Sequence, residues 1–367
     1  TAVWGSQQAN LFPGARYDGV FGMWYGKAPG VDRTGDAFKH ANFAGVWPKG
    51  GVLAVAGDDH SCKSSTLPSQ SEYAFQDFEM PVLSPADVQE VLDYGLLGYA
   101  MSRFSGLWVG LIALADTMDS GATIDISLDR HRFVLPENFR LPAGGLGIRL
   151  KDQPLDKERR LRTQKIPAAL AFARANRIDR VMLGGSRPRL GIVCQGQAYK
   201  DVIEAFAAMG VSAAEAQALG VAIYKVGMPW PLEPQGLRAF AAGLETLMVV
   251  EHKRPLIETQ ARAALYDLPA HARPRIIGKT DEHGRPLLSE LVSLSVAEIA
   301  LAIADRLPPG PHMDRVHDYL NRVSAASMAA VTLSSDQQRK PFFCSGCPHN
   351  SSTRLPEGSR ALAGIGC

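Results

Sequence analysis

The chain has 367 residues, 46% of them hydrophobic and 21% charged, which is typical of a globular protein with more than one domain. Its 39 Lys and Arg against 37 Asp and Glu give a formal net charge of +2, so no basic surface predicts a nucleic-acid partner. The longest apolar run, residues 106–115, is far shorter than the ~20 residues of a membrane-spanning helix, so no membrane partner is expected either.

The five cysteines indicate the compartment. Cys62 and Cys194 stand alone, and the number is odd, which favours a reducing environment over a disulfide framework. The first residues lack the charged start and apolar core of a signal peptide, so we expect a cytoplasmic protein. Because no initiator Met is present and the last residue is a cysteine, we also expect a fragment that begins and ends inside domains.

Residues 1–50 are rich in glycine and aromatic residues. Small residues beside large rings allow close approach of the backbone to a ligand or a packed partner. The segment is therefore interpreted as a cofactor-side surface, a subunit contact or a closely packed core helix. Residues 22–28 superficially resemble a phosphate-binding loop, but three residues separate the glycines and Ala28 replaces the Ser or Thr that would hold magnesium, so we reject that interpretation.

Residues 52–56 are apolar and bounded by glycine, which predicts a buried parallel strand. The strand delivers a polar loop to its carboxyl end, where open α/β sheets bind ligands. The candidate site residues in this loop are Asp58, Asp59, His60, Ser64 and Ser65. A solvated loop capped by its own Asp and Ser side chains is an equally good interpretation of the pattern.

Strand and helix signals alternate from residue 81 onward. Residues 81–83 and 107–114 are predicted strands, and between them Ser84 is the expected N-cap of a helix that extends to Ala100. This βαβ unit predicts a first domain of α/β type with parallel strands.

The pattern repeats in a second α/β domain. Its predicted strands are 190–194, 221–226 and 246–250, followed by helices over 196–207, 235–242 and 255–264. The third strand ends on Glu251, which we expect to cap the next helix rather than to act in catalysis. A further helix is predicted over 295–305, and residues 268–290 are expected to be irregular.

Three thiols lie at the end of the chain. Cys344 and Cys347 form a Cys-x-x-Cys motif, and Cys367 follows after a loop. Two thiolates on a tight turn and a third from a loop can reach one metal centre. An iron–sulfur cluster, a zinc ion and unligated thiols all fit this spacing, and the fourth ligand would lie outside the chain.

Several sequence blocks together resemble one family. The blocks are residues 50–65, 81–85, 225–232, 249–258, 343–349 and 364–367. In this order the chain resembles the thiamin-diphosphate-dependent 2-oxoacid:ferredoxin oxidoreductases, and most closely their fused indolepyruvate ferredoxin oxidoreductase form. The resemblance extends over nearly the whole chain, so it is more specific than any single block.

The resemblance implies a domain order of α/β units. Residues 1–135 would be a partial pyrimidine-binding-type domain, 136–185 a connecting arm, and 186–306 a domain like the carboxyl-terminal domain of transketolase. Residues 307–340 would be a linker, and 341–367 the truncated start of a diphosphate-binding domain. The activating glutamate and the diphosphate and magnesium motif of the family have no match here, so we expect the fragment alone to be inactive.

The resemblance also implies an activity. Such enzymes oxidatively decarboxylate a 2-oxoacid, here an aryl one such as indolepyruvate, to its acyl-CoA. They use thiamin diphosphate with Mg²⁺ and pass electrons through [4Fe–4S] clusters to ferredoxin. Coenzyme A is a second substrate, and a homodimer is expected. Pyruvate or a branched-chain 2-oxoacid is an alternative substrate, and a non-catalytic scaffold with a zinc ion is an alternative of another class.

The resemblance assigns roles to individual residues. The loop residues named above would be catalytic, with His60 acting as an acid or base or binding the substrate carboxylate. His349 would contact the cofactor. Cys344, Cys347 and Cys367 would ligate a [4Fe–4S] cluster, with zinc and unligated thiols as the alternatives.

Overall fold

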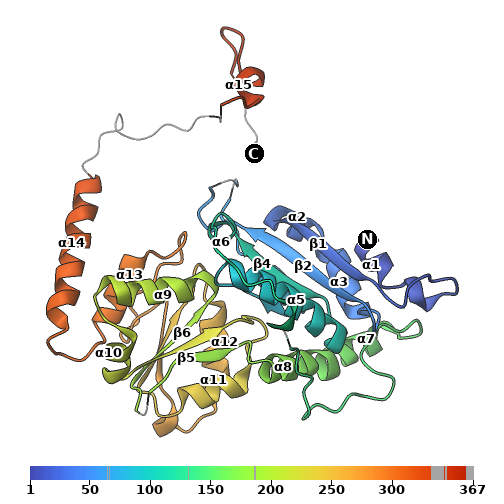
Figure 1. Ribbon diagram of the computed structural model, residues 1–367, viewed down its shortest axis with the longest axis horizontal. Helices are drawn as coiled ribbons and strands as arrows, with labels where there is room; N and C mark the ends of the chain where they lie inside the picture. The colour runs from blue at the N-terminus through green and yellow to red at the C-terminus, as the bar shows by residue number, and fades with distance from the viewer. Residues whose placement is uncertain are drawn as a thin grey trace.

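A computed structural model describes residues 1–331, 343 and 345–360, except residues 64, 66, 131 and 186. It contains two sheets, one in each half of the chain, with helices on both of their faces (Figure 1). Most of the strand pairs are parallel. The predicted α/β fold class is therefore confirmed.

The first sheet has four parallel strands in the order β1-β2-β4-β3. The strands are β1 (Phe21–Lys27), β2 (Gly51–Asp58), β3 (Val82–Leu83) and β4 (Val109–Leu114). Consecutive side chains of β2 point to opposite faces. Val52 and Ala54 pack against one group of helices, whereas Leu53 packs against α5 (Val88–Ser105) on the other face.

Both ends of α5 are capped, and the N-cap differs from the one that the sequence indicated. The N-cap is Asp87, whose carboxylate accepts a hydrogen bond from the Glu90 backbone N–H at 3.0 Å. The prediction of Ser84 as N-cap was wrong, because the Ser84 N–H instead donates to the carbonyl of Gly227, 2.9 Å away in the second half of the chain. At the other end Gly106 adopts φ 73°, a conformation that favours glycine.

The second sheet has five strands in the order β5-β7-β6-β8-β9. They are β5 (Arg180–Leu183), β6 (Leu190–Gln195), β7 (Val221–Val226), β8 (Thr246–Val250) and β9 (Arg275–Ile277). Strand β5 is antiparallel to β7, and the other pairs are parallel. Helices α9 (Gly196–Ala208) and α13 (Val296–Ala304) cover one face, and α11 (Pro234–Ala241) and α12 (Leu256–Tyr266) cover the other.

The remaining elements are short or lie around the sheets. In the first half they are α1 (Ala2–Ser6), η1 (Ala9–Leu11), α2 (Ala28–Arg33), α3 (Gly35–Ala44), α4 (Glu72–Asp77), α6 (Ala115–Met118) and η2 (Leu128–Arg130). Next come α7 (Pro154–Arg160), the π-helical turn η3 (Leu161–Lys165), α8 (Ile166–Ala175), α10 (Ala213–Ala218), η4 (Ala270–Ala272), α14 (Met313–Val331) and α15 (His349–Ser352). None of the described helices is long and apolar enough to cross a membrane.

Three strands were not predicted. Strand β1 lies where the sequence offered a surface segment or a core helix, and β9 lies in a segment expected to be irregular. Strand β5 begins at Arg180, inside the segment 136–185 interpreted as a connecting arm. The other predicted domain boundaries stay predictions.

The two sheets are joined directly by backbone hydrogen bonds. The Val82 N–H of β3 donates to the Trp230 carbonyl at 2.7 Å. Behind this contact, one carboxylate oxygen of Asp179 accepts hydrogen bonds from the N–H groups of Gly227 and Met228 at 2.8 and 2.9 Å. The loop after β7 therefore closes the open edge of the first sheet.

Candidate functional site

Asp58, the last residue of β2, is almost fully buried. One carboxylate oxygen accepts a hydrogen bond from the Ser71 hydroxyl and the other from the Ser71 N–H, both at 2.6 Å. Burial raises the pKa of Asp58, while these hydrogen bonds act in the opposite direction. Asp58 thus fixes the start of α4, which is the capping role that the sequence left open.

Asp59 closes the loop that follows. Its backbone N–H donates to the Ser69 hydroxyl at 2.8 Å, and its carbonyl accepts from the Ser69 N–H at 3.1 Å. Its carboxylate accepts from the Lys63 N–H at 3.0 Å. The two ends of the loop are therefore held together, and only its tip projects.

His60 turns inward toward the second sheet and is 6% exposed. Its ring lies 5.6 Å from that of His252, at 61°, and neither ring nitrogen has a hydrogen-bond partner in the described part of the chain. Burial, followed by the charges of His252 and Lys253, lowers the pKa of His60 to about 3. The imidazole is therefore neutral at physiological pH.

The tip of the loop is the more accessible part. Ser65 is half-buried, and Ser64 lies outside the described residues. Lys63 forms an ion pair with Asp116 at the start of α6, which follows β4. Cys62 has φ 58°, an uncommon conformation for a residue with a side chain.

Glu251 faces this loop from the end of β8. Its carboxylate accepts hydrogen bonds from the N–H groups of Leu256, Ile257 and Glu258 at 3.1, 2.8 and 2.9 Å. The predicted capping role of Glu251 is therefore confirmed. Burial outweighs these hydrogen bonds and raises its pKa to about 7.

Glu72, which sequence reasoning missed, lies between these acids. It is the first residue of α4, is 2% exposed, and its Oε2 atom has no hydrogen-bond partner among the described residues. Burial, together with the charge of Asp58, raises the pKa of Glu72 to about 8. The residues next to Glu72 in the sequence do not indicate that it is buried among other acids. Those acids, Asp58 and Glu251, lie at the ends of strands of two different sheets.

The second sheet supplies ordered polar groups at the same place. Nδ1 of His252 accepts a hydrogen bond from the Leu294 N–H at 3.0 Å, so Nε2 carries the proton and faces Asp201 Oδ2 at 3.2 Å. Lys279 donates to the carbonyls of Glu251 and Ser289 at 2.6 and 3.1 Å. The carboxyl ends of β2 and β8 thus meet in one buried polar junction.

The terminal thiols are described only in part. Sγ of Cys347 lies 3.2 Å from Nδ1 of His349, whose ring stacks on Phe343 at 5.2 Å. Cys344 and Cys367 lie outside the described residues. Within the part that the structure describes, no three His, Cys, Asp or Glu side chains are grouped to hold a metal ion.

The described residues do not by themselves fit thiamin diphosphate or Mg²⁺. Asp58, Asp59 and His60 are buried in contacts within the loop and with the second sheet. They form no metal-ligand cluster with other described residues.

Comparison with known proteins finds similar sequences along most of the chain. A family model described as the indolepyruvate oxidoreductase domain matches residues 180–330. "Indolepyruvate oxidoreductase subunit IorA" of Methanothermobacter thermautotrophicus is 25% identical over 354 residues, 92% of this chain and 49% of that protein. The protein of the same name from Pyrococcus abyssi is 24% identical, over 96% of this chain and 52% of its own length. The chain spans about half the length of these relatives.

A solved structure shows the same fold. The 2-oxoglutarate:ferredoxin oxidoreductase of Magnetococcus marinus, with 2-oxoglutarate, coenzyme A and succinyl-CoA bound, has a TM-score of 0.50 at 15% identity. The match covers 84% of this chain and 55% of that one. Together, these comparisons confirm the predicted resemblance to the indolepyruvate and other 2-oxoacid oxidoreductases.

Proposed function

We propose that this chain is part of a cytoplasmic oxidoreductase that decarboxylates an aryl 2-oxoacid, indolepyruvate, oxidatively to its acyl-CoA. The observation that carries the proposal is the similarity to indolepyruvate oxidoreductase subunits over more than nine-tenths of the chain. When bound, thiamin diphosphate supplies the carbanion-stabilising chemistry of such a reaction. Because the relatives are about twice as long as the matched region, the activity is proposed for the longer protein and not for this chain alone.

Within that protein the loop after β2 would have mainly a positioning role. Asp58 and Asp59 hold its two ends, and His60 anchors it to the second sheet. A neutral imidazole with two unpaired nitrogens can hydrogen-bond a substrate but is a poor proton donor. We propose that His60 binds the substrate when this contact opens, and that Ser64 and Ser65 act with it.

The electron path would use the terminal thiols. We propose that Cys344, Cys347 and Cys367 hold a [4Fe–4S] cluster with a fourth ligand from outside the chain, that His349 lies toward the cofactor, and that ferredoxin accepts the electrons. The spacing of the thiols supports this. Iron and sulfide analysis of the anaerobically purified full-length protein tests it, and zinc without iron would contradict it.

One observation favours a second substrate class. The solved relative has 2-oxoglutarate bound, so another 2-oxoacid is the alternative. The test is coenzyme A-dependent viologen reduction by the full-length protein with indolepyruvate, phenylpyruvate, 2-oxoglutarate, pyruvate and 2-oxoisovalerate. We expect the highest kcat/KM with an arylpyruvate, and no rate with either arylpyruvate would refute the substrate assignment. Light scattering on the same preparation tests the proposed homodimer.

A further inference from the structure

A large cavity lies at the end of the first sheet opposite the junction. It has a volume of about 760 Å³, within the ~300–1,000 Å³ of ordinary ligand pockets. Its walls include Phe21, the first residue of β1, which is in register with Gly51 at the amino end of β2. Asp58 ends the same strand seven residues later, so the cavity and the candidate site are about 20 Å apart.

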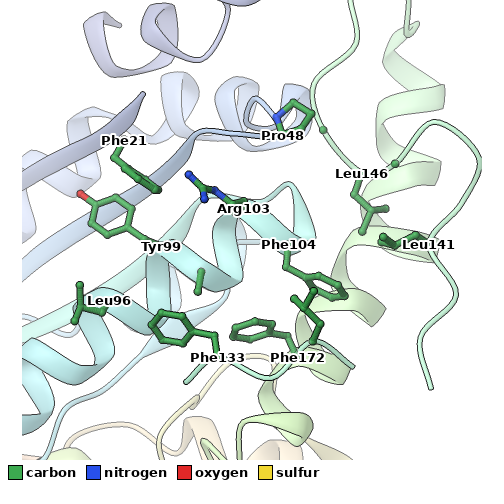
Figure 2. A pocket seen from close by; sticks show the side chains of 14 residues that line it. Phe21, Pro48, Leu96, Tyr99, Arg103, Phe104, Phe133, Leu141, Leu146 and Phe172 are labelled. Atoms are coloured by element: carbon green, nitrogen blue, oxygen red, sulfur yellow. The ribbon is translucent and has the colours of Figure 1, made fainter. Parts of the chain in front are cut away.

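The lining is almost entirely apolar and rich in aromatic rings (Figure 2). Phe21 and Tyr99 meet edge to face at 5.0 Å and 67°. Phe104 of α5 lies 5.7 Å from Phe172 of α8, at 34°. The cavity also touches Phe133, which lies in the irregular segment that leads toward α7. Ring edges and faces exposed in this way favour an aromatic ligand.

Arg103 is the single charged side chain among the residues that line the cavity. Its Nε and Nη2 groups donate to the carbonyls of Gly50 and Lys49 at 3.3 and 2.9 Å. Its Cζ atom lies 4.7 Å from the centroid of the Phe21 ring. These contacts fix the guanidinium, while its Nη1 group makes no hydrogen bond within the described part of the chain. A fixed guanidinium with free N–H donors is suited to a carboxylate.

We propose that this cavity binds an aromatic monocarboxylate, with its rings between the two aromatic pairs and its carboxylate at Nη1 of Arg103. The lining contains no acidic residue, so no group of the cavity competes for the guanidinium. Arg103 is exposed without a ligand; a ligand seated against the lining rings would cover the guanidinium and strengthen the ion pair by reducing its contact with water. The site does not depend on the proposed catalytic function, because it lies at the other end of the sheet.

The test uses isothermal titration calorimetry on the full-length protein. The probes are 2-naphthaleneacetate and 2-naphthaleneacetamide, which have the same rings but differ in charge. We expect one saturable site per chain that prefers the acid, and we expect Arg103→Met to weaken binding of the acid about tenfold with little effect on the amide. Arg238→Met is the matched control, because Arg238 is an exposed arginine that also donates to a backbone carbonyl, that of Ala264; it should change neither affinity.

Substitutions that fill the cavity with a larger side chain test whether the probes bind here or elsewhere on the protein. Ala100→Trp should abolish binding of both probes, and Leu96→Trp, at a position that is 44% exposed, does the same from the rim if the first variant fails to fold. No saturation, equal affinity for acid and amide, or unchanged binding in Arg103→Met would each overturn the proposal. A second copy that occupies the face would also overturn it; light scattering would then show a dimer that Leu96→Trp dissociates.

Discussion

Three carboxyl groups, those of Asp58, Glu72 and Glu251, come together where β2 and β8 end. Buried acids this close cannot all ionise without a large electrostatic penalty, so protons are retained near neutral pH. Asp58 and Glu251 accept two and three hydrogen bonds respectively, whereas one oxygen of Glu72 has none in the described structure. Glu72 is therefore the group best suited to hold the proton.

The first prediction concerns this proton. Folding raises the pKa of Glu72 from 4.5 to about 8, so its contribution to stability is fully present below pH 4.5 and is lost as the pH rises through 8. Glu72→Gln should therefore stabilise the protein more at pH 9 than at pH 6, by roughly 2–3 kcal/mol. Urea unfolding at both pH values measures the difference. Asp77→Asn, on the exposed side of the same helix, should show no such pH dependence, and equal effects of Glu72→Gln at both pH values would contradict the prediction.

His60 provides a second prediction. Because burial and neighbouring positive charge lower its pKa to about 3, its ring should not titrate between pH 5 and 8. The Hε1 resonance, assigned by comparison with His60→Asn, should keep its chemical shift over this range. A midpoint for His60 near 6.5 would show that the loop is open in solution.

The position of these residues could be predicted from sequence, but their contacts could not. A glycine-bounded apolar strand followed by acids and a histidine placed Asp58 and His60 at a strand end. Their partners, Ser71 and His252, are 13 and 192 residues away, and no local pattern connects them. Only the folded chain shows that Asp58 has a capping role and that His60 lies at the junction.

At the scale of elements, the strands with continuous apolar runs were predicted, and so was the short edge strand β3, but the edge strands β1, β5 and β9 were not. Strand β1 has glycines at positions 22 and 26 among Met and aromatic residues, and Phe21, Met23 and Tyr25 are 55, 52 and 79% exposed. Such a strand lacks the apolar run that marks a central parallel strand. Strand β9 has three residues, and β5 is antiparallel and at an edge. Short edge strands depend on the neighbour that they pair with more than on their own sequence.

The start of α12 carries the third prediction. Glu251 accepts hydrogen bonds from three N–H groups in a buried helix terminus. The Leu256 N–H also donates to the Arg254 carbonyl at 3.0 Å, but the N–H groups of Ile257 and Glu258 lie in the first turn, where no helical partner is available. Glu251→Ala should therefore destabilise the protein by about 2–3 kcal/mol, measured by urea unfolding at pH 6. Glu245→Ala, which removes an exposed ion pair with Arg189, should change stability by less than about 1 kcal/mol. Similar losses in the two variants would argue against the capping role.

For the whole molecule, the sequence indicated two α/β units but not how they meet. The junction combines backbone hydrogen bonds between β3 and residues 227–230, ring contacts between His60 and His252, and a buried ion pair between Glu90 and Lys225. The block 225–232 was one of those that resemble the family. In the structure its residues contact the first sheet. The block both ends β7 and covers the edge of the first sheet, where Trp230 forms a bridge with Val82 of β3.

The buried ion pair between Glu90 and Lys225 is the part of this junction that should be most sensitive to a single substitution. Lys225 is 1% exposed and contacts Glu90 of α5, which also accepts a hydrogen bond from the Ala86 N–H at 2.9 Å and pairs with Arg180 at 3.2 Å. Removing one partner of a buried pair leaves the other charge uncompensated. Lys225→Met should therefore destabilise the protein by about 3–5 kcal/mol. Arg180 remains beside Glu90 in this variant, which favours the lower end of that range.

The last prediction is that loss of this ion pair in Lys225→Met allows the two halves of the chain to unfold separately. Of the five tryptophans, Trp4, Trp24 and Trp108 pack in the core of the first sheet, and Trp230 also packs against it from the second half. Tryptophan fluorescence therefore follows the first sheet, whereas far-ultraviolet circular dichroism follows both. In the unsubstituted protein the urea midpoints from the two probes should coincide, because the buried junction makes unfolding cooperative. In Lys225→Met they should separate, while Lys200→Met, which removes a more exposed pair with Asp87, should leave them together. Coincident midpoints in Lys225→Met would mean that the remaining junction contacts, those of β3 and of His60 with His252, hold the two halves as one unit.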